Sequence, residues 1–375
     1  SPAIERLDYG TGIIVAMSDD KKKEKEYREK GVKLPTTIEA NNWYVGFNWL
    51  DPVVGKGDNP AQAERNRKLR HALSIAIDWE EHIAIFERGQ GVAAQGPLPP
   101  SLFGYREDGP SSFNPVVYRK GPDGKPVRRS IDEAKRLLAE AGYPDGREAT
   151  TGKPLVLNFD YQSAASPGTK ALLDWCTKQF AKIGVQLEVR ATDYNRFQDK
   201  MTKGSVQIFF WGWLADYPDA ENFLFMLYGP NSKALTGGNG ENNTNYQNPE
   251  FDKLFEQMKF LEDGPEKQKL IDRMIEIAQT DAVWSFGYFP TSAAVYHQWI
   301  TNGKPTQLIR NHIGYLRLDP ELRARKLAEW NQPVWWPIPL LAIGLFAAIV
   351  PAWFGWRRRE RETAARTLAQ EGVAP

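Results

Sequence analysis

Three short apolar runs decide the fold: Leu155-Val156-Leu157-Asn158-Phe159, Val185-Gln186-Leu187-Glu188-Val189 and Val206-Gln207-Ile208-Phe209-Phe210-Trp211. Each run has the length and the β-branched or aromatic content of a strand. The amphipathic segments between them, 169–183 and 194–202, predict helices. A β-α-β-α-β order predicts an α/β fold with a mainly parallel sheet and right-handed crossovers. Ligands of such folds usually bind beyond the carboxyl ends of the strands.

The flanking sequence predicts further elements of the same lobe. Ser130 and Glu133 have the spacing of a capping box, and Gly142 stands where a helix-ending glycine is expected. We also expect a strand at 43–48, a helix over 63–88, helices near 249–261 and 265–280, a β-like stretch at 283–295 and loops over 301–333.

Residues 334–356 form a run of 23 residues without a charged side chain. As a helix the run would be about 34 Å long, enough to cross a hydrocarbon core of roughly 30 Å. Tryptophans lie at both ends, and Arg357, Arg358, Arg359 and Arg361 follow. The positive-inside tendency therefore predicts a single-pass transmembrane helix with a cytoplasmic C-terminus. The alternative is a buried core helix, but such helices are shorter and seldom end in arginines. Pro351 is expected to kink or end the helix.

The composition excludes several classes of function. Lys and Arg number 48 against 47 Asp and Glu, so the chain lacks the basic footprint of a nucleic-acid-binding protein. Cys176 is the single cysteine, and the four histidines have no metal-ligand spacing. No P-loop, dinucleotide or G-x-S-x-G motif is present. We therefore expect no catalytic residues, no metal and no cofactor.

The candidate site follows the third strand directly. Trp213 and Tyr217 offer flat apolar surfaces there, and Asp216 and Asp219 offer anionic acceptors. A carboxylate among aromatic rings suits a ligand's ammonium group, because charge-assisted hydrogen bonds are strong. The alternative is that residues 216–219 form only a turn, since Asp and Pro are common in turns. A hydrolase that uses the two aspartates is a much weaker interpretation, because nothing in the sequence pairs them as acid and base.

Six segments resemble the extracellular solute-binding proteins of family 5, the dipeptide- and oligopeptide-binding proteins of ABC importers. Residues 66–78 are similar to the R-x-A-L-x-x-A-I-D helix of that family, and residues 213–223 are similar to its W-x-A-D-Y-x-D-P-x-N-F segment. Ala220 stands where the family usually has Pro. The other four, at 44–48, 91–100, 134–143 and 245–252, also occur in the family's order.

The resemblance implies a type II periplasmic-binding-protein lobe, one of two that close on a solute and dock on a permease pair. In peptide-binding members the Asp of W-x-A-D receives the ligand's α-ammonium group. This role carries over to Asp216, with Trp213 and Tyr217 lining the cleft. Tyr288 and Phe289 lie where the family has aromatic residues near the return to the first lobe.

The resemblance also implies a division of the chain. Residues 1–45 correspond to the end of lobe one, 46–297 to the second lobe, 298–333 to the return and linker, 334–356 to the membrane helix and 357–375 to a cytoplasmic tail. We expect the missing part of lobe one, with the export signal, to be a separate N-terminal half of the same protein.

The expected function is that of a membrane-anchored subunit of an ABC importer on the periplasmic side of the bacterial inner membrane. It would bind peptides or similar small solutes and deliver them to the permease subunits. The alternative is a receptor-like accessory or structural subunit of a larger membrane complex without a transport role.

Overall fold

The computed structural model describes residues 9–11, 25, 27–162, 166–303 and 312–370. It divides into two compact units, Ser1–Leu316 and Arg317–Pro375. The first unit is an α/β lobe built on a nine-stranded sheet, and the described part of the second unit is mainly helical.

The main sheet follows the strand order β1-β11-β4-β10-β8-β9. β8 (Val156–Gln162) pairs in parallel with both β9 (Gln186–Thr192) and β10 (Ile208–Leu214). β4 (Asn41–Phe47) runs antiparallel to β10 and to the long β11 (Trp284–His297). The short strands β1 (Tyr9–Thr11), β2 (Val32–Lys33), β3 (Thr36–Ile38) and β5 (Gly91–Ala93) all pair antiparallel with β11.

The α/β class and the β-α-β-α-β unit are therefore confirmed, but the sheet is mixed rather than mainly parallel. Among the described strands of the sheet, parallel pairing is confined to β8, β9 and β10. The pattern of a buried strand indicates its length and burial but not its direction. Direction depends on the end of the sheet at which a strand begins, and β4 begins at the end opposite to β8, β9, β10 and β11.

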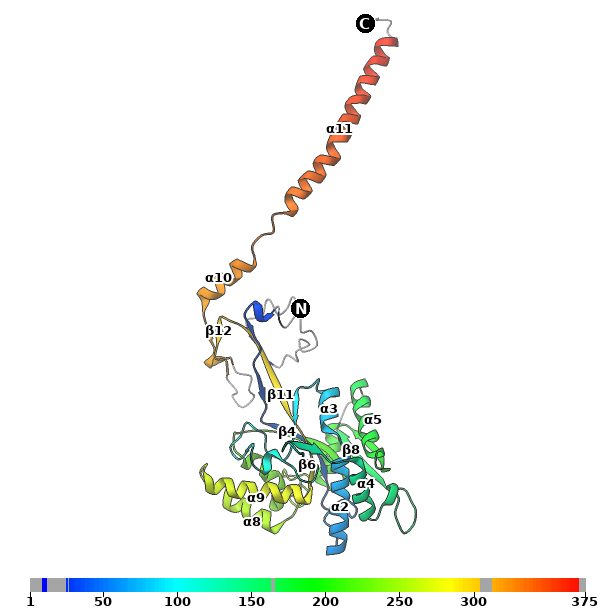
Figure 1. Ribbon diagram of the computed structural model, residues 1–375, viewed down its shortest axis with the longest axis vertical. Helices are drawn as coiled ribbons and strands as arrows, with labels where there is room; N and C mark the ends of the chain where they lie inside the picture. The colour runs from blue at the N-terminus through cyan, green and yellow to red at the C-terminus, as the bar shows by residue number, and fades with distance from the viewer. Residues whose placement is uncertain (1–8, 12–24, 26, 163–165, 304–311, 371–375) are drawn as a thin grey trace. The chain divides into compact units, whose positions relative to one another are not determined.

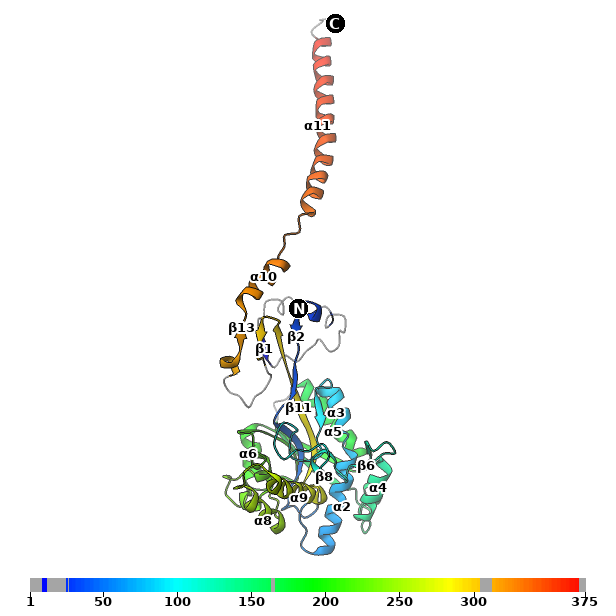
Figure 2. The same cartoon turned by 60° about the vertical axis from the view of Figure 1, so that its left-hand side comes forward.

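Helices cover both faces of the sheet (Figure 1). One layer consists of α2 (Pro60–Ala76), α3 (Trp79–Phe86), α4 (Ile131–Glu140) and α5 (Pro167–Ala181). The other consists of α6 (Tyr194–Thr202), α7 (Glu221–Leu224), α8 (Pro249–Met258) and α9 (Pro265–Asp281). Figure 2 shows α8 and α9 again on the opposite side of the strands from α4.

Side chains of β10 alternate between these two layers. Phe209, Trp211 and Trp213 pack in the core that contains α8 and α9, whereas Ile208 and Phe210 pack in the core that contains α2 and α5. This is the two-residue period of a strand that is buried on both faces. The alternation fixes which side chains of β10 can face either core.

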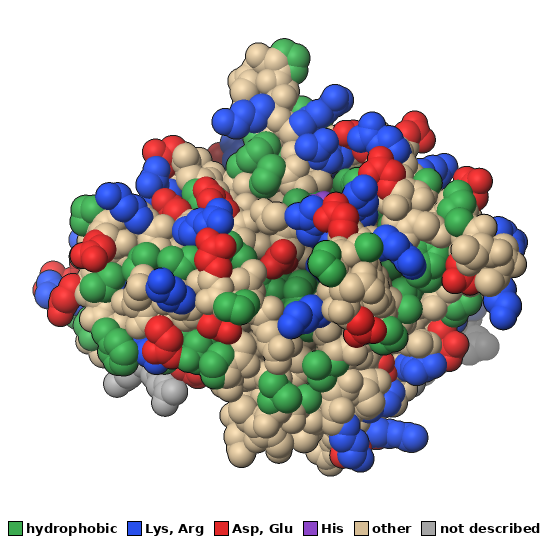
Figure 3. Space-filling model, turned by 90° about the horizontal axis from the view of Figure 1, so that it is seen from below, with side chains coloured by type: hydrophobic (Ala, Val, Ile, Leu, Met, Phe, Trp, Pro, Cys, Tyr) green, Lys and Arg blue, Asp and Glu red, His purple; other side chains and the backbone are tan. Residues whose placement is uncertain are grey.

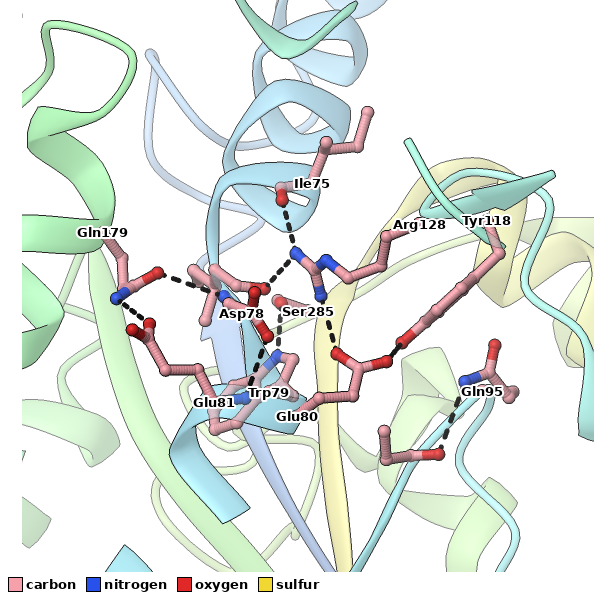
Figure 4. A network of polar contacts seen from close by, with 12 residues as sticks. Ile75, Asp78, Trp79, Glu80, Glu81, Gln95, Tyr118, Arg128, Gln179 and Ser285 are labelled. Carbon is pink, nitrogen blue, oxygen red and sulfur yellow. Dashed lines mark hydrogen bonds and ion pairs between the residues drawn. The ribbon is translucent and has the colours of Figure 1, made fainter. Parts of the chain in front are cut away.

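The predicted helix over 63–88 is two helices, because the chain breaks at Ile77 and Asp78. The Asp78 carboxylate caps α3 by accepting from the Glu81 amide at 2.9 Å. The Arg128 guanidinium, from the hairpin of β6 (Tyr118–Lys120) and β7 (Pro126–Arg128), donates to the Ile75 and Ile77 carbonyls at 2.6 and 2.7 Å (Figure 4). It therefore binds carbonyls that the end of α2 leaves unpaired.

The predicted capping box at α4 is confirmed. The Ser130 hydroxyl accepts from the Glu133 amide at 3.2 Å, and the Glu133 carboxylate accepts from the Ser130 amide at 2.8 Å. Gly142 follows the helix with φ of +90°, a conformation that favours glycine.

The second unit differs from two expectations. Residues 320–330, expected as loop, form α10 (Pro320–Trp330), whose N-cap Asp319 accepts from the Leu322 amide at 2.9 Å. α11 (Pro337–Gln370) continues through Pro351, which removes one backbone donor without ending the helix here. Pro337–Arg366 is the one described helical stretch that is long and apolar enough to cross a membrane. No residue of its most apolar part is buried. Two short strands lie near the boundary of the units in the sequence, β12 (Ile300–Thr301) in the first unit and β13 (Arg317–Leu318) in the second.

The burial of His82 indicates that the lobe loses stability in acid. Its ring lies 5.1–5.3 Å from the rings of Trp79, Phe86, Trp175 and Tyr288, and its Nδ1 has no hydrogen-bond partner among the described residues. Burial lowers the pKa of His82 to about 4. As the pH falls below about 6.5, His82 becomes protonated in the unfolded chain but stays neutral in the folded lobe. The contribution of His82 to the free energy of unfolding is therefore complete above that pH and falls toward pH 4.

We expect His82→Phe to weaken this dependence by up to about 1.4 kcal/mol per pH unit. The check is the free energy of unfolding in urea at pH 7, 6 and 5. His71→Phe is the comparison, since burial also lowers the pKa of His71 to about 4. An unchanged slope in the His82 variant would show that other groups carry the acid sensitivity.

Candidate functional site

The candidate site begins where β10 ends. The Trp213 ring meets the Phe225 ring edge-on at 5.2 Å and is only partly buried. The next residue, Leu214, is 54% exposed. The Ala215 amide then donates to the Ala40 carbonyl at 2.9 Å and extends the pairing with β4 by one bond. The chain is thus held firmly up to the residue before Asp216.

Asn222 fixes the loop that follows. This side chain is 2% exposed, and its Oδ1 accepts from the Trp213 indole at 3.2 Å and from the Asp216 amide at 2.9 Å. This one acceptor oxygen therefore connects the end of β10 and the residues after it to the start of α7. The hydrogen bond to the Asp216 amide also holds the backbone from which the Asp216 side chain extends.

Asp216 is exposed at the carboxyl end of β10. Within the described residues its carboxylate makes no hydrogen bond and no ion pair. A carboxylate on a rigid loop without an internal partner is available to a ligand's donor or cation.

Asp219 is different, because its carboxylate is already paired. Its Oδ2 lies 2.7 Å from the Lys267 ammonium, and its Oδ1 accepts from the Glu221 amide at 2.8 Å. Lys267 is 4% exposed and also contacts Asp263 at 2.9 Å. Burial disfavours the charged ammonium, but the hydrogen bonds to Asp219 and Asp263 outweigh it and raise the pKa of Lys267. Asp219 thus holds the loop to α9.

Tyr217 projects next to these carboxylates. It is 43% exposed, and its hydroxyl donates to Glu221. Partial burial and this hydrogen bond raise the pKa of Tyr217 to about 12. The ring is therefore neutral at physiological pH and presents an apolar face to solvent.

Tyr288 and Phe289 lie in the packed interior of the lobe. Tyr288 is 6% exposed and donates to Glu87 at 2.8 Å, while Phe289 is 1% exposed and packs in the core with α8 and α9. Burial, followed by the nearby Glu87 carboxylate, raises the pKa of Tyr288. The structure therefore brings together Trp213, Asp216, Tyr217 and Asp219, and it puts the two β11 aromatics in the cores.

Sequence reasoning missed three polar residues around the loop. Asn222 lies inside the quoted segment and could have been found from it, because a short amide side chain beside a turn often bonds backbone groups. Lys267 lies on the amphipathic α9, where the pattern gives no sign that it is buried. Asn42 pairs in register with Trp213 and donates to the Pro97 carbonyl at 2.9 Å, and its buried Oδ1 has no hydrogen-bond partner in the part of the chain that the structure describes.

Other chemistry is not apparent in the described residues. They contain no group of three His, Cys, Asp or Glu side chains that could hold a metal ion. A surface pocket of about 610 Å³ is lined by residues of 107–126 and by Glu276 and Gln279 of α9, away from the end of β10. On the face shown in Figure 3, basic and acidic side chains are interspersed.

The chain belongs to the bacterial extracellular solute-binding proteins, family 5, whose middle region matches residues 5–234. Among curated relatives, heme-binding protein A of Haemophilus influenzae is 29% identical over 235 residues, which are 61% of this chain and 38% of the relative. A dipeptide-binding protein of Pseudomonas aeruginosa is 25% identical over 273 residues, 71% of this chain and 44% of the relative. This is a family of solute-binding proteins, not of enzymes.

Solved structures agree on the fold, which is that of type II periplasmic binding proteins. The periplasmic binding protein DppA of Helicobacter pylori, in complex with the peptide STSA, superposes with a TM-score of 0.60 at 20% identity. The match covers 84% of this chain and 53% of that one. HbpA2 of Haemophilus parasuis gives a TM-score of 0.59 at 21% identity over 76% of this chain and 49% of that one. The chain thus spans about two fifths of its curated relatives and half of these structures.

Asn222 gives a test of the loop geometry. Asn222→Ala leaves the Trp213 and Asp216 donors without their acceptor, so we expect it to lower the free energy of unfolding by about 1–3 kcal/mol. Asn222→Asp keeps an acceptor oxygen and should recover part of the loss. Urea unfolding measures the stability, and the Trp213 indole proton resonance reports the bond. Asn239→Ala, in an exposed loop, is the matched control, and equal losses in both would contradict the assigned role.

Proposed function

We propose that this chain is the solute-binding part of an ABC importer and that it binds a peptide or a similar small cationic solute at the end of β10. The observation that carries the proposal is the Asp216 carboxylate, which is exposed and unpaired within the described residues on a loop fixed by Asn222. Family membership supplies the class of protein, and the loop supplies the chemistry.

The charge around the loop favours a ligand with an ammonium group. Asp216, Asp219, Glu221 and Asp263 contribute four carboxylates, while Lys267 contributes one ammonium and is fully occupied by two of them. An unpaired carboxylate in this acidic setting binds an ammonium group by charge-assisted hydrogen bonds of about 1.5–3 kcal/mol. The exposed Tyr217 and the partly exposed Trp213 provide apolar surfaces beside it, where the ligand's aliphatic part can pack.

The proposal includes a partner that supplies the rest of the first lobe. β11 extends past its pairing with β4, and its residues 292–297 pair with the short strands β1, β2 and β3 among the described residues. Among the described residues, the core there contains four buried residues, Tyr27, Val32, Ala293 and Val295. A ribbon with so small a core is marginal in isolation. We infer that 1–45 and 298–333 belong to this first lobe, that 46–297 is the second lobe, and that a separate N-terminal half completes the cleft.

The proposal also includes a membrane anchor. In it, residues 334–356 span the membrane, 357–375 form a cytoplasmic tail, and the lobe stays on the outer side of a bacterial inner membrane. Charge supports this orientation, because five arginines of 357–366 follow the apolar run. Tethering raises the effective concentration of a binding lobe near its permease, to the millimolar range for short linkers.

Two neighbouring aspartates provide the decisive test. We expect Asp216→Asn to lower the affinity for a tripeptide with a free amino terminus about 10- to 100-fold, because one charge-assisted bond is lost. Its stability should not change, since the carboxylate has no internal partner. Asp219→Asn should lower stability by about 1–2 kcal/mol with a smaller change in affinity, because Lys267 loses a partner.

Calorimetric titration and urea unfolding of the purified complex measure both quantities. An N-acetylated tripeptide should bind weakly to the wild type and equally weakly to Asp216→Asn. Asp174→Asn, which removes an exposed charge paired with Lys170 on α5, is the control. Unchanged affinity in Asp216→Asn would exclude Asp216 from the site, and a complex that binds no solute would favour an accessory or structural subunit.

The anchor and its orientation are tested by labelling. A cysteine at Ala365, in a Cys176→Ala background, should react with a membrane-impermeant maleimide only after the spheroplasts are opened. A cysteine at the exposed Asn239 of the lobe should react in intact spheroplasts. Deleting residues 334–375 should release the protein from carbonate-washed membranes. Labelling of both positions from the same side would contradict the proposed topology.

A further inference from the structure

α10 carries apolar and basic side chains on the same side of the helix. Leu322, Lys326 and Trp330 are four residues apart, so they lie along one face at about 100° per residue. Arg323 and Leu327 extend the same face. The other side carries two alanines, two glutamates and one arginine: Ala324, Ala328, Glu321, Glu329 and Arg325. The three large apolar residues and two of the three cations of α10 thus share one half of its surface.

This half of the α10 surface is not buried in a hydrophobic core. None of the residues of α10 is buried. Flanking apolar side chains are exposed as well: Leu318 is 54%, Val334 65%, Trp335 67% and Trp336 65% exposed. Contiguous exposed apolar groups of this kind mark a surface that another phase or partner covers.

The acidic residues of the segment lie at the start of the helix or beside a lysine. Asp319 caps the helix, and Glu329 pairs with Lys326 at 2.7 Å. Glu321 stands in the first turn, where the helix dipole favours a negative charge. α10 carries three basic residues against two glutamates, so its net charge is +1, and two of the basic residues share the side of its large apolar residues.

The distance along the chain to α11 is short. α10 ends at Trp330 and α11 begins at Pro337, so six residues separate them. Six residues span about 20 Å when fully extended. With α11 in a bilayer, α10 stays within that distance of the headgroups.

We propose that α10 lies in the outer surface of the bilayer, with Leu322, Leu327 and Trp330 in the headgroup region and with Arg323 and Lys326 at anionic lipid phosphates. This inference rests on the proposed membrane anchor and goes beyond it, because it fixes the orientation of the linker. Long basic side chains extend along an apolar face to reach phosphates, and tryptophan favours the interface. Apolar burial and attraction to anionic lipid add together in such interfacial helices.

Spin labels on the full chain test the proposal. Single cysteines at Leu322, Leu327, Ala324 and Ala328, in a Cys176→Ala background, are labelled and reconstituted in phosphatidylglycerol–phosphatidylcholine bilayers. A fifth label at Ile343 of α11 is the membrane reference. Collision rates with oxygen and with a water-soluble nickel chelate are measured for each label.

We expect labels at 322 and 327 to collide more with oxygen and less with nickel than labels at 324 and 328, with the helical period. In bilayers of phosphatidylcholine alone this contrast should shrink, as it should in Arg323→Gln/Lys326→Gln on the anionic bilayer. Arg325→Gln, on the opposite face, is the matched control and should leave the contrast unchanged.

Each other outcome overturns the proposal in a distinct way. A lipid-exposed Ile343 label with equally aqueous labels on both faces of α10 would leave the anchor standing and exclude the interfacial helix. Labels at 322 and 327 that are shielded from both reagents would show that a protein covers this face. An Ile343 label that is exposed to nickel would remove the anchor and the interfacial helix together.

Discussion

The structure of the lobe depends on a sheet that is buried on both faces. β10 and β4 send alternate side chains into two separate cores, one built with α8 and α9 and the other with α2 and α5. Tyr44 and Trp284 stack at 3.8 Å on one face, while Val45 and Phe47 pack on the other. A shift of one residue in the register would exchange the two sets of side chains. Burial on both faces therefore fixes the register, and the register fixes where β10 ends.

The candidate site inherits its rigidity from this arrangement. The last side chain of β10 that faces the α8–α9 core, Trp213, is tied to Asn222, and Asn222 in turn holds the Asp216 amide. Asp219 attaches the same loop to α9 through its ion pair with Lys267. Two aspartates three residues apart thus have different environments: one is occupied by a buried ammonium, and the other is open. A binding loop gains from this division, because the occupied carboxylate positions the open one.

Much of this could be predicted from local patterns. The two-residue and 3.6-residue periods located the strands and helices of 155–214, and the Ser130–Glu133 spacing located the start of α4. The pattern did not show that α2 ends before Asp78, because the end depends on Arg128 from a distant hairpin. It did not show strand direction either, so the antiparallel pairing of β4 and β11 was unforeseen. α10 could have been found from its Asp319-Pro320-Glu321 start, which is a common helix-initiating sequence.

The sequence by itself determined the family, the order of the elements, the apolar C-terminal run and the segment that carries the candidate site. These depend on local composition and spacing, which a linear pattern records. Only the tertiary structure decided that Asp219 is paired while Asp216 is open and that Tyr288 and Phe289 lie in the cores. Those distinctions depend on which distant side chains arrive within about 3 Å, the range of a hydrogen bond. Lys267 is 48 residues from Asp219 in the chain, and only the packing of α9 beside the loop brings them together.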